Sequence, residues 1–287
     1  MVRNFAENEV EPLVREMDEK EAIPIDIINK MGELGIMGIP VPEKYGGAGM
    51  DTVAYATAIM ELAKVDASVA ITVAAHTSLG TMPIVLAGTE KQKMKYVPDL
   101  ASGKVLGAFG LTEPGSGSDA GATITTAEKN GDEYIINGSK IFITNAGISG
   151  YLNLTAQIIE DGKQIGVGAF ITEANNPGLT IAPKEKKMGW RASDTRQLFF
   201  KDMCIPEENM IGAPKDGFKT FLKTLTGGRI SIGALSVGTA EGAYLKALNY
   251  ACEREAFGKK IHQFQTVGFQ LADMATKIEA AKLLVYH

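Results

Sequence analysis

The stretch AFGLTEPGSGSDAG, from Ala108 to Gly121, decides between two folds. Gly115, Gly117 and Ala120 follow the spacing G-x-G-x-x-A, with which dinucleotide-binding folds hold a pyrophosphate. That fingerprint requires a strand before it and a helix after it. The residues after Gly121 are instead short alternating runs separated by turn dipeptides, so the sequence does not predict a Rossmann fold.

From Phe109 to about Ile211 the pattern predicts strands. Asn-Gly and Asp-Gly dipeptides favour the positive φ values of two-residue hairpins. The dipeptides are Asn130-Gly131, Asn137-Gly138 and Asp161-Gly162. The runs between them, among them TITTAE, EYIIN and KIFIT, are apolar or alternating, as in half-buried strands. We therefore expect a central antiparallel β-barrel or sandwich over residues 108–214.

Residues 1–107 predict an N-terminal α-helical domain. Thr89 and Gln92 form a capping-box signature at the start of one helix, and Pro98 is expected to end it. Asp66 or Ser68 is placed to cap a second helix.

Helical periodicity returns after Asp216 and predicts the start of a C-terminal helical bundle over residues 215–287. The apolar seam of its last segment consists of Val267, Leu271, Met274, Ile278, Ala281 and Val285. Both ends of the sequence interrupt a helical pattern, so we expect a piece of a longer natural protein. The fold class is multidomain, with α and β parts.

Composition excludes several classes of protein. Of 287 residues 45% are hydrophobic and 22% charged, with a net charge of −5 and no basic block, which argues against a nucleic-acid surface. The two cysteines and three histidines lack ligand spacing, so neither a disulfide framework nor a metal site is expected. The most apolar run contains His76, Gly80 and Pro83, and predicts helices buried in protein rather than a membrane span.

Five motifs, with the helix–β–helix order, resemble the acyl-CoA dehydrogenase family across essentially the whole chain. They are LTEPGSGSDA, NGSKIFITNAG, MGWRASDT, CIPEENMIG and REAFGKKIHQFQ. The resemblance implies an FAD flavoprotein, a tetramer or dimer of dimers, in the cytoplasm or, in a eukaryote, the mitochondrial matrix. It implies dehydrogenation of short- to medium-chain acyl-CoA to trans-2-enoyl-CoA. A glutamate would remove the α-proton, the β-hydrogen would leave as hydride, and electrons would pass to an electron-transferring flavoprotein.

The resemblance also assigns residues to the flavin. Those expected to line it are Phe109, Leu111, Thr112, Gly117 and Ser118, with Phe142, Ile143 and Thr144 covering one face. Those expected to reach the FAD of a neighbouring subunit are Arg254, Phe257 and Gln265. Thr112 would hydrogen-bond the polar edge of the ring, and Phe142 stands where many relatives carry Trp.

Three residues are expected at the acyl-CoA: Ser118, Thr226 and Arg229. Many relatives have Asp where Thr226 stands, which puts that hydrogen bond to CoA in doubt. Arg229 opens a small, apolar helical stretch, and a structural salt bridge is the alternative interpretation.

The catalytic glutamate is the main departure from the family pattern. In one branch it precedes the arginine that matches Arg229, where this chain has Gly228. In the other branch it lies beyond His287, so the catalytic base is unknown here and the fragment itself is expected to be inactive. Glutamates that match no catalytic position are Glu241, Glu253 and Glu255. The alternatives are a non-catalytic FAD- or CoA-binding protein, a helical interaction protein, and an acyl-CoA oxidase, whose extra domain nothing here resembles.

Overall fold

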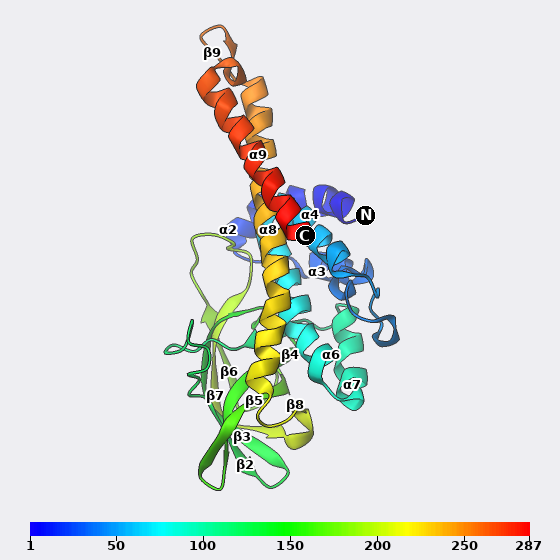
Figure 1. The fold of residues 1–287 in the computed structure, drawn as a ribbon, viewed down its shortest axis with the longest axis vertical. Coiled ribbons are helices and arrows are strands. Elements are labelled where there is room, and N and C mark those ends of the chain that lie inside the picture. The colour runs from blue at the N-terminus through cyan, green and yellow to red at the C-terminus, as the bar shows by residue number, and fades with distance from the viewer.

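The computed structural model describes residues 1–287. Figure 1 shows helices from the first third of the chain, a β-sheet, and two long helices from the last third. The first long helix, α8 (Gly217–Glu253), runs past both other parts and then projects beyond them beside α9 (Gln265–Tyr286). The expected order of a helical region, a central β-region and a further helical region is confirmed.

Seven α-helices form the first part. They are α1 (Val2–Phe5), α2 (Val14–Lys20), α3 (Ile25–Glu33), α4 (Thr52–Val65), α5 (Ala67–Ala74), α6 (Met82–Ala87) and α7 (Glu90–Ala101). The side chain of Asp66, not Ser68, caps α5 by accepting the N–H of Val69 at 2.8 Å. The capping box of Thr89 and Gln92 forms as expected at the start of α7.

The expectation that Pro98 ends this helix is wrong, because α7 continues to Ala101. Proline lacks one backbone N–H, so it removes one helical hydrogen bond. The next turn still closes, since the N–H of Ser102 donates to the Pro98 carbonyl at 3.1 Å. Val97 and Leu100 are fully buried, and their burial holds this turn in the helix.

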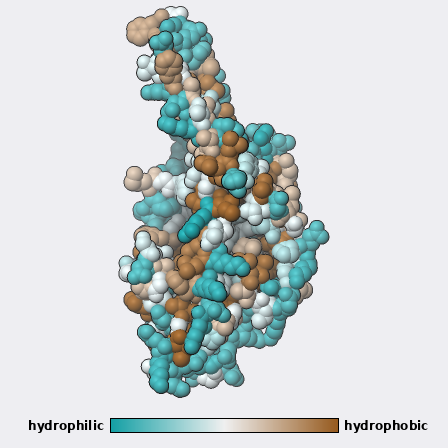
Figure 2. Space-filling view, in the orientation of Figure 1, coloured by the Kyte–Doolittle hydropathy of each residue, from teal (hydrophilic) through white to brown (hydrophobic).

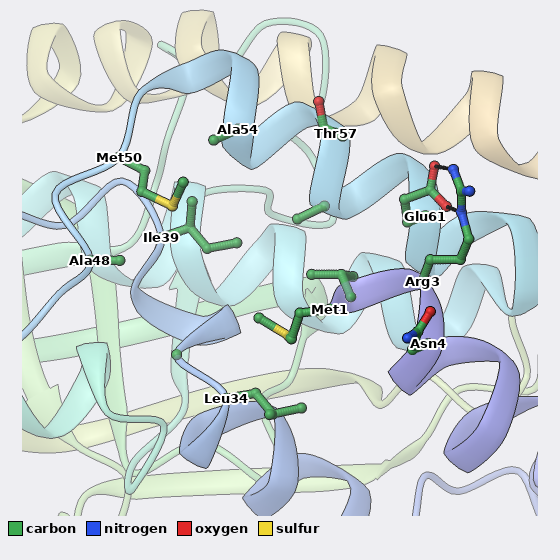
Figure 3. Close-up of a pocket in the computed structure, with 13 residues that line it drawn as sticks. Met1, Arg3, Asn4, Leu34, Ile39, Ala48, Met50, Ala54, Thr57 and Glu61 are labelled. Carbon is green, nitrogen blue, oxygen red and sulfur yellow. Dashed lines mark hydrogen bonds and ion pairs between the residues drawn. The ribbon is translucent and has the colours of Figure 1, made fainter.

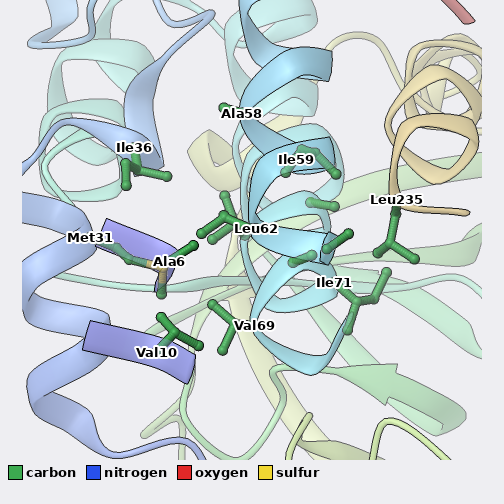
Figure 4. Packing of buried hydrophobic residues seen from close by; sticks show 14 of the residues in the cluster. Ala6, Val10, Met31, Ile36, Ala58, Ile59, Leu62, Val69, Ile71 and Leu235 are labelled. Carbon is green, nitrogen blue, oxygen red and sulfur yellow. The ribbon is translucent and has the colours of Figure 1, made fainter. Parts of the chain in front are cut away.

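Helix α4 lies at the centre of the largest apolar core. Figure 4 shows Ile59 and Leu62 of α4 with Val10 on one side and Leu235 of α8 on the other. Each of these side chains is at most 1% exposed, and each contributes about 1.5–3 kcal/mol by leaving water. The core of the first part is therefore completed by a helix from the last part.

The segment Ala67–Ala87 is long and apolar enough to cross a membrane by length and composition alone. It comprises α5, a wide π-helical stretch η5 (Ala75–Thr81) and α6. Within the structure, 78% of its most apolar window is buried.

Eight strands form one sheet. They are β1 (Gly107–Gly110), β2 (Thr126–Asn130), β3 (Glu133–Thr144), β4 (Tyr151–Glu160), β5 (Lys163–Glu173), β6 (Leu179–Lys184), β7 (Thr195–Pro206) and β8 (Met210–Ile211). The order is β6-β7-β3-β2-β4-β5-β8, and β1 pairs with β4. Both β1 and β2 run parallel to β4, so the sheet is mixed and does not close, rather than an antiparallel barrel.

Two of the three turn dipeptides form hairpins as expected. Gly131 and Gly162 have φ of 59° and 71° in the β2–β3 and β4–β5 turns. The third expectation is wrong, because Gly138 lies inside β3, where the register with β7 shifts. A Cβ at Gly138 would lie 2.5 Å from Thr125 Oγ1, so the glycine permits close strand packing instead of a turn.

Helices α8 and α9 are joined through two short strands, β9 (Glu255–Ala256) and β10 (Lys259–Lys260). Gly238 and Gly242 of α8 leave no room for a Cβ against the backbone of α4 at Met60 and Lys64. In the expected seam of α9, Leu271 is buried, and the residues that pack against the large core are Ile278, Ala281 and Val285. Met274 is 37% exposed and does not belong to the packed seam.

Candidate active site

A cavity of about 160 Å³ lies where the helical part, the sheet and the start of α8 meet. We call it the β1–β3 cavity. It is lined by Ala75, Leu79, Phe109, Leu111, Thr112, Phe142, Ile143, Thr144 and Leu225. Six of these nine residues belong to the two motifs that the sequence analysis assigns to the flavin. They are Phe109, Leu111, Thr112 and the FIT run 142–144. The structure thus brings together two motifs that are about thirty residues apart in the chain.

The first wall of the cavity is formed by Phe109 of β1 and by Leu111 and Thr112, which follow this strand. Contacts with the helical part hold β1 in place. Gly80 and Gly107 approach so closely that a Cβ on Gly80 would lie 2.6 Å from the Gly107 carbonyl carbon. The N–H of Gly107 donates to His76 Nδ1 at 3.0 Å, and Asn153 Nδ2 donates to the Gly80 carbonyl at 2.6 Å. These contacts fix the π-helical stretch η5, which supplies Ala75 and Leu79, against the sheet.

His76 is buried in a way that defines its protonation. Burial lowers the pKa of His76 to about 4, while the hydrogen bond to the Leu100 carbonyl acts in the opposite direction. Because Nδ1 accepts the N–H of Gly107, the ring proton lies on Nε2 and is donated to Leu100 at 3.0 Å. His76 is therefore a neutral structural link between η5, α7 and β1.

The second wall is an irregular end of β3. The register with β7 shifts between Lys140 and Ile143, and Phe142 has a φ of 59° and a 62% exposed side chain. The N–H of Ile141 donates to the Thr112 carbonyl at 2.9 Å, which joins this wall to the first. The bulge thus leaves the Phe142 ring free at the mouth of the cavity.

The glycine-rich loop between the walls is open to solvent. Gly115 and Gly117 have no atom within 4 Å of an added Cβ, and Ser118 is exposed. The loop still has a defined shape, because the backbones of Glu113 and Ser116 exchange hydrogen bonds of 3.0 and 3.1 Å. Gly117 and Ser118 do not line the cavity; they lie on the loop that leaves it.

A second cavity of about 310 Å³, the α5–α8 cavity, shares three lining residues with the first. It is lined by Ile71, Ala74, Ala75, Ser78, Leu79, Leu225, Gly228, Arg229 and Ile232. Arg229 lines it and takes part in none of the ion pairs of the chain, which argues against the structural salt bridge considered above. Thr226 does not line it, and its hydroxyl donates to the Leu222 carbonyl within α8.

No carboxylate lines either cavity. Glu241 is held by Lys64 at 3.0 Å and by Lys282 at 3.5 Å, away from both. Glu253 is the last residue of α8 and Glu255 lies in β9, and neither belongs to the lining of either cavity. None of the three glutamates is therefore placed to act on a ligand in these cavities.

Three expected flavin residues lie far from the cavities in this chain. Arg254, Phe257 and Gln265 belong to the projecting tip that carries β9 in Figure 1. Phe257 is 96% exposed with a φ of 51°. The single chain does not bring these residues to its own cavities.

Sequence reasoning missed several contributors to the site. Leu79 and Leu225 line both cavities, and the ring of Phe221 stacks on Phe109 at 4.1 Å. These residues carry no sequence signal beyond apolar helical periodicity, which marks core and cavity residues alike.

A third cavity, of about 590 Å³, lies between α1, α4 and the loops after α3, and shares no residue with the other two. Figure 3 shows its apolar lining, including Met1 and Met50, and a bidentate pair of Arg3 and Glu61 at 2.8 and 3.2 Å. Its two charged residues neutralise each other, and no motif residue lines it. Figure 2 shows further apolar surface over the middle of the face along which α8 runs, where Ile230 and Ile232 are exposed.

The chain matches the three acyl-CoA dehydrogenase families in order: the N-terminal domain over residues 1–104, the middle domain over 108–203 and the C-terminal domain over 215–287. It is 48% identical to the short-chain specific acyl-CoA dehydrogenase of Clostridium acetobutylicum, covering 100% of this chain and 76% of that one. A chain in the solved structure of the electron transferring flavoprotein of Acidaminococcus fermentans matches with a TM-score of 0.97 and 47% identity, covering 100% and 75%. The acyl-CoA dehydrogenase complexed with FAD from Bacillus anthracis matches with a TM-score of 0.93 and 38% identity, covering 99% and 50%. The motifs, the domain order and the fold agree, and the chain belongs to the acyl-CoA dehydrogenase family of oxidoreductases.

Proposed function

We propose that this protein binds FAD in the β1–β3 cavity and dehydrogenates short- to medium-chain acyl-CoA thioesters to trans-2-enoyl-CoA. The observation that carries the proposal is the convergence of Phe109–Thr112 and Phe142–Thr144 on one cavity that continues into a second, apolar one. The short-chain specific relative from Clostridium acetobutylicum supports the substrate class.

The lining of the β1–β3 cavity fits a flavin ring, which has two apolar faces and a polar edge. Its walls are mainly apolar, and the hydroxyls of Thr112 and Thr144 have no hydrogen-bond partner within the chain. Both threonines are half-buried, so their hydroxyls can bond a ligand edge that carries donors and acceptors. Open backbone at Gly115 and Gly117 allows a pyrophosphate to approach. FAD bound here would supply the acceptor for a hydride, and the similar Bacillus anthracis protein is complexed with FAD.

The α5–α8 cavity suits the acyl chain of the substrate. Apolar side chains such as Ile71 and Ile232 line it, and it meets the β1–β3 cavity at Leu79 and Leu225. Arg229, without an ion-pair partner, provides a cation for the anionic CoA, and the exposed Ser118 hydroxyl provides a hydrogen bond. The chain's residues thus hold the thioester between an apolar pocket and the flavin, which is the proximity that the reaction requires.

The remaining parts of the proposal concern assembly and partners. We place Arg254, Phe257 and Gln265 at the FAD of a neighbouring subunit in a tetramer or dimer of dimers. They lie on the projecting tip of the chain, far from its own cavities. An electron-transferring flavoprotein takes the electrons, in keeping with the Acidaminococcus fermentans structure. The catalytic glutamate comes from outside residues 1–287, since neither cavity lining has a carboxylate. The protein acts in the cytoplasm, or in the mitochondrial matrix of a eukaryote.

The test is purification of the protein followed by anaerobic mixing with butyryl-CoA or octanoyl-CoA. We expect a yellow protein with a flavin spectrum, and FAD released on denaturation. Where the catalytic glutamate is present, acyl-CoA should bleach that spectrum. A colourless protein that also fails to take up added FAD would refute the proposal. Bleaching of a protein limited to residues 1–287 would reopen Glu241, Glu253 and Glu255 as bases.

A further inference from the structure

The chain contains one ion pair that is completely removed from water. Lys140 Nζ and Glu113 Oε1 are 2.7 Å apart, and their side chains are 0% and 1% exposed. In every other ion pair at least one side chain is 15% exposed or more. Burying two charges costs several kcal/mol per ion, which a single contact rarely returns.

The pair is enclosed by a complete set of hydrogen bonds. The Lys140 ammonium also donates to the Leu111 carbonyl, Thr123 Oγ1 and Thr155 Oγ1, each at 3.1 Å. The Glu113 carboxylate accepts the Thr123 hydroxyl and the backbone N–H groups of residues 124 and 125. Burial lowers the pKa of Lys140 to about 8, against which Glu113 acts. Burial alone would raise the pKa of Glu113, but hydrogen bonds from Lys140 and Thr123 hold it at about 2.

The position of the pair relates it to the β1–β3 cavity. Lys140 lies on β3, two residues before Phe142, where the pairing with β7 is interrupted. Its ammonium binds the carbonyl of Leu111, which lines the opposite wall, and Glu113 directly follows Thr112 in that wall. One buried group therefore connects the two walls at the point where ordinary strand pairing is lost.

We propose that Lys140 and Glu113 are positioning residues for the flavin, which set the separation of the walls Leu111–Thr112 and Phe142–Thr144. This inference rests on the proposed FAD site. Replacing a buried ion pair by apolar side chains of similar volume often leaves the stability of a protein unchanged or raises it. The stability of the fold therefore does not by itself require this pair. What an apolar pair cannot do is hold the Leu111 carbonyl, and with it the backbone that carries the Thr112 hydroxyl.

The test compares flavin binding with stability in the double variant Lys140→Met with Glu113→Gln, which removes both charges with little change of volume. We expect the apoprotein to fold with a thermal midpoint near that of the wild type. We expect FAD to bind about tenfold or more weakly, roughly 1.4 kcal/mol, in a titration of flavin fluorescence. The visible circular dichroism of the bound flavin should change as well, since it reports the asymmetry of the ring's surroundings.

Two further variants complete the test. Lys64→Met removes two largely buried ion pairs, to Glu61 within α4 and to Glu241 of α8, away from both cavities, and should leave FAD affinity within about twofold. Thr155→Val removes one of the four ammonium contacts and should weaken FAD about threefold, roughly 0.6 kcal/mol, even if the double variant does not fold. Unchanged affinity and unchanged visible circular dichroism in a folded double variant, or in Thr155→Val, would overturn the inference. Absence of FAD binding in the wild type would instead overturn the proposed function.

Discussion

The neutral, buried His76 makes the stability of this protein depend on pH. Its ring is fully buried, accepts the N–H of Gly107 and donates to the Leu100 carbonyl. A second ring proton would point at the Gly107 donor and leave a charge without a partner. The pKa is therefore lower in the folded chain, about 4, than the ordinary 6.5 of an exposed histidine.

The sign and size of the effect follow from this difference. Between these two values the unfolded chain binds the proton and the folded chain does not. The stabilisation is thus complete above about pH 6.5 and is lost as the pH falls towards 4. The free energy of unfolding should decrease by about 2 kcal/mol between pH 7 and pH 5 from this one group, and by about 3 kcal/mol at pH 4.

The assay compares the wild type with His76→Gln, which keeps a hydrogen-bonding side chain but cannot titrate. Urea unfolding at pH 7 should show the variant less stable by about 1–3 kcal/mol, because native hydrogen bonds are lost. The difference in stability should shrink by about 2 kcal/mol at pH 5, because only the wild type loses the contribution of His76. The effects of carboxylate titration are alike in both proteins and cancel in the comparison. The chain has three histidines, so the ring resonance missing from the variant identifies His76 in NMR spectra. A His76 resonance that titrates near pH 6.5 would refute this reasoning.

Three other perturbations test the two cavities. Thr112→Val should weaken FAD binding by about 1–3 kcal/mol in a fluorescence titration, because a polar ring edge loses its hydroxyl partner; equal affinity would place Thr112 outside the flavin site. Gly80→Ala should lower the free energy of unfolding by about 1–3 kcal/mol, because its Cβ would meet the backbone of Gly107 at 2.6 Å; an unchanged urea midpoint would contradict that tight approach. In the complete enzyme, Arg229→Met should raise the KM for acyl-CoA about tenfold by removing a charged hydrogen bond, with FAD affinity unchanged. An unaltered KM would show that Arg229 does not contact CoA.

Local sequence signals correctly predict the structural features, such as helix caps and hairpin turns, that are formed by residues close together in the chain. The caps at Asp66 and Thr89 and the hairpins at Gly131 and Gly162 involve partners within a few positions. The loop and strand motifs that resemble the family also indicate most of the β1–β3 cavity, because they are contiguous runs.

The features that the sequence did not predict are formed by residues that are far apart in the chain. Asn137-Gly138 has the composition of a turn, but pairing with β7 and packing on Thr125 keep the chain extended there. The parallel pairing of β1 and β2 with β4 joins segments that no periodicity links. Lys140 in an alternating strand indicates a solvent-facing side chain, and its burial follows only from Glu113 and two threonines brought in by the fold.

The close packing of α8 on α4 has a consequence for synthesis of the chain. Gly238 rests against the carbonyl of Met60, which leaves the ribosome about 180 residues earlier. At about 5–20 residues per second, the apolar flank of α4 stays uncovered for roughly 9–36 s. During that interval Ile59 and its neighbours face solvent or another nascent chain. Slow translation before residue 238 therefore prolongs the exposure of this flank to aggregation.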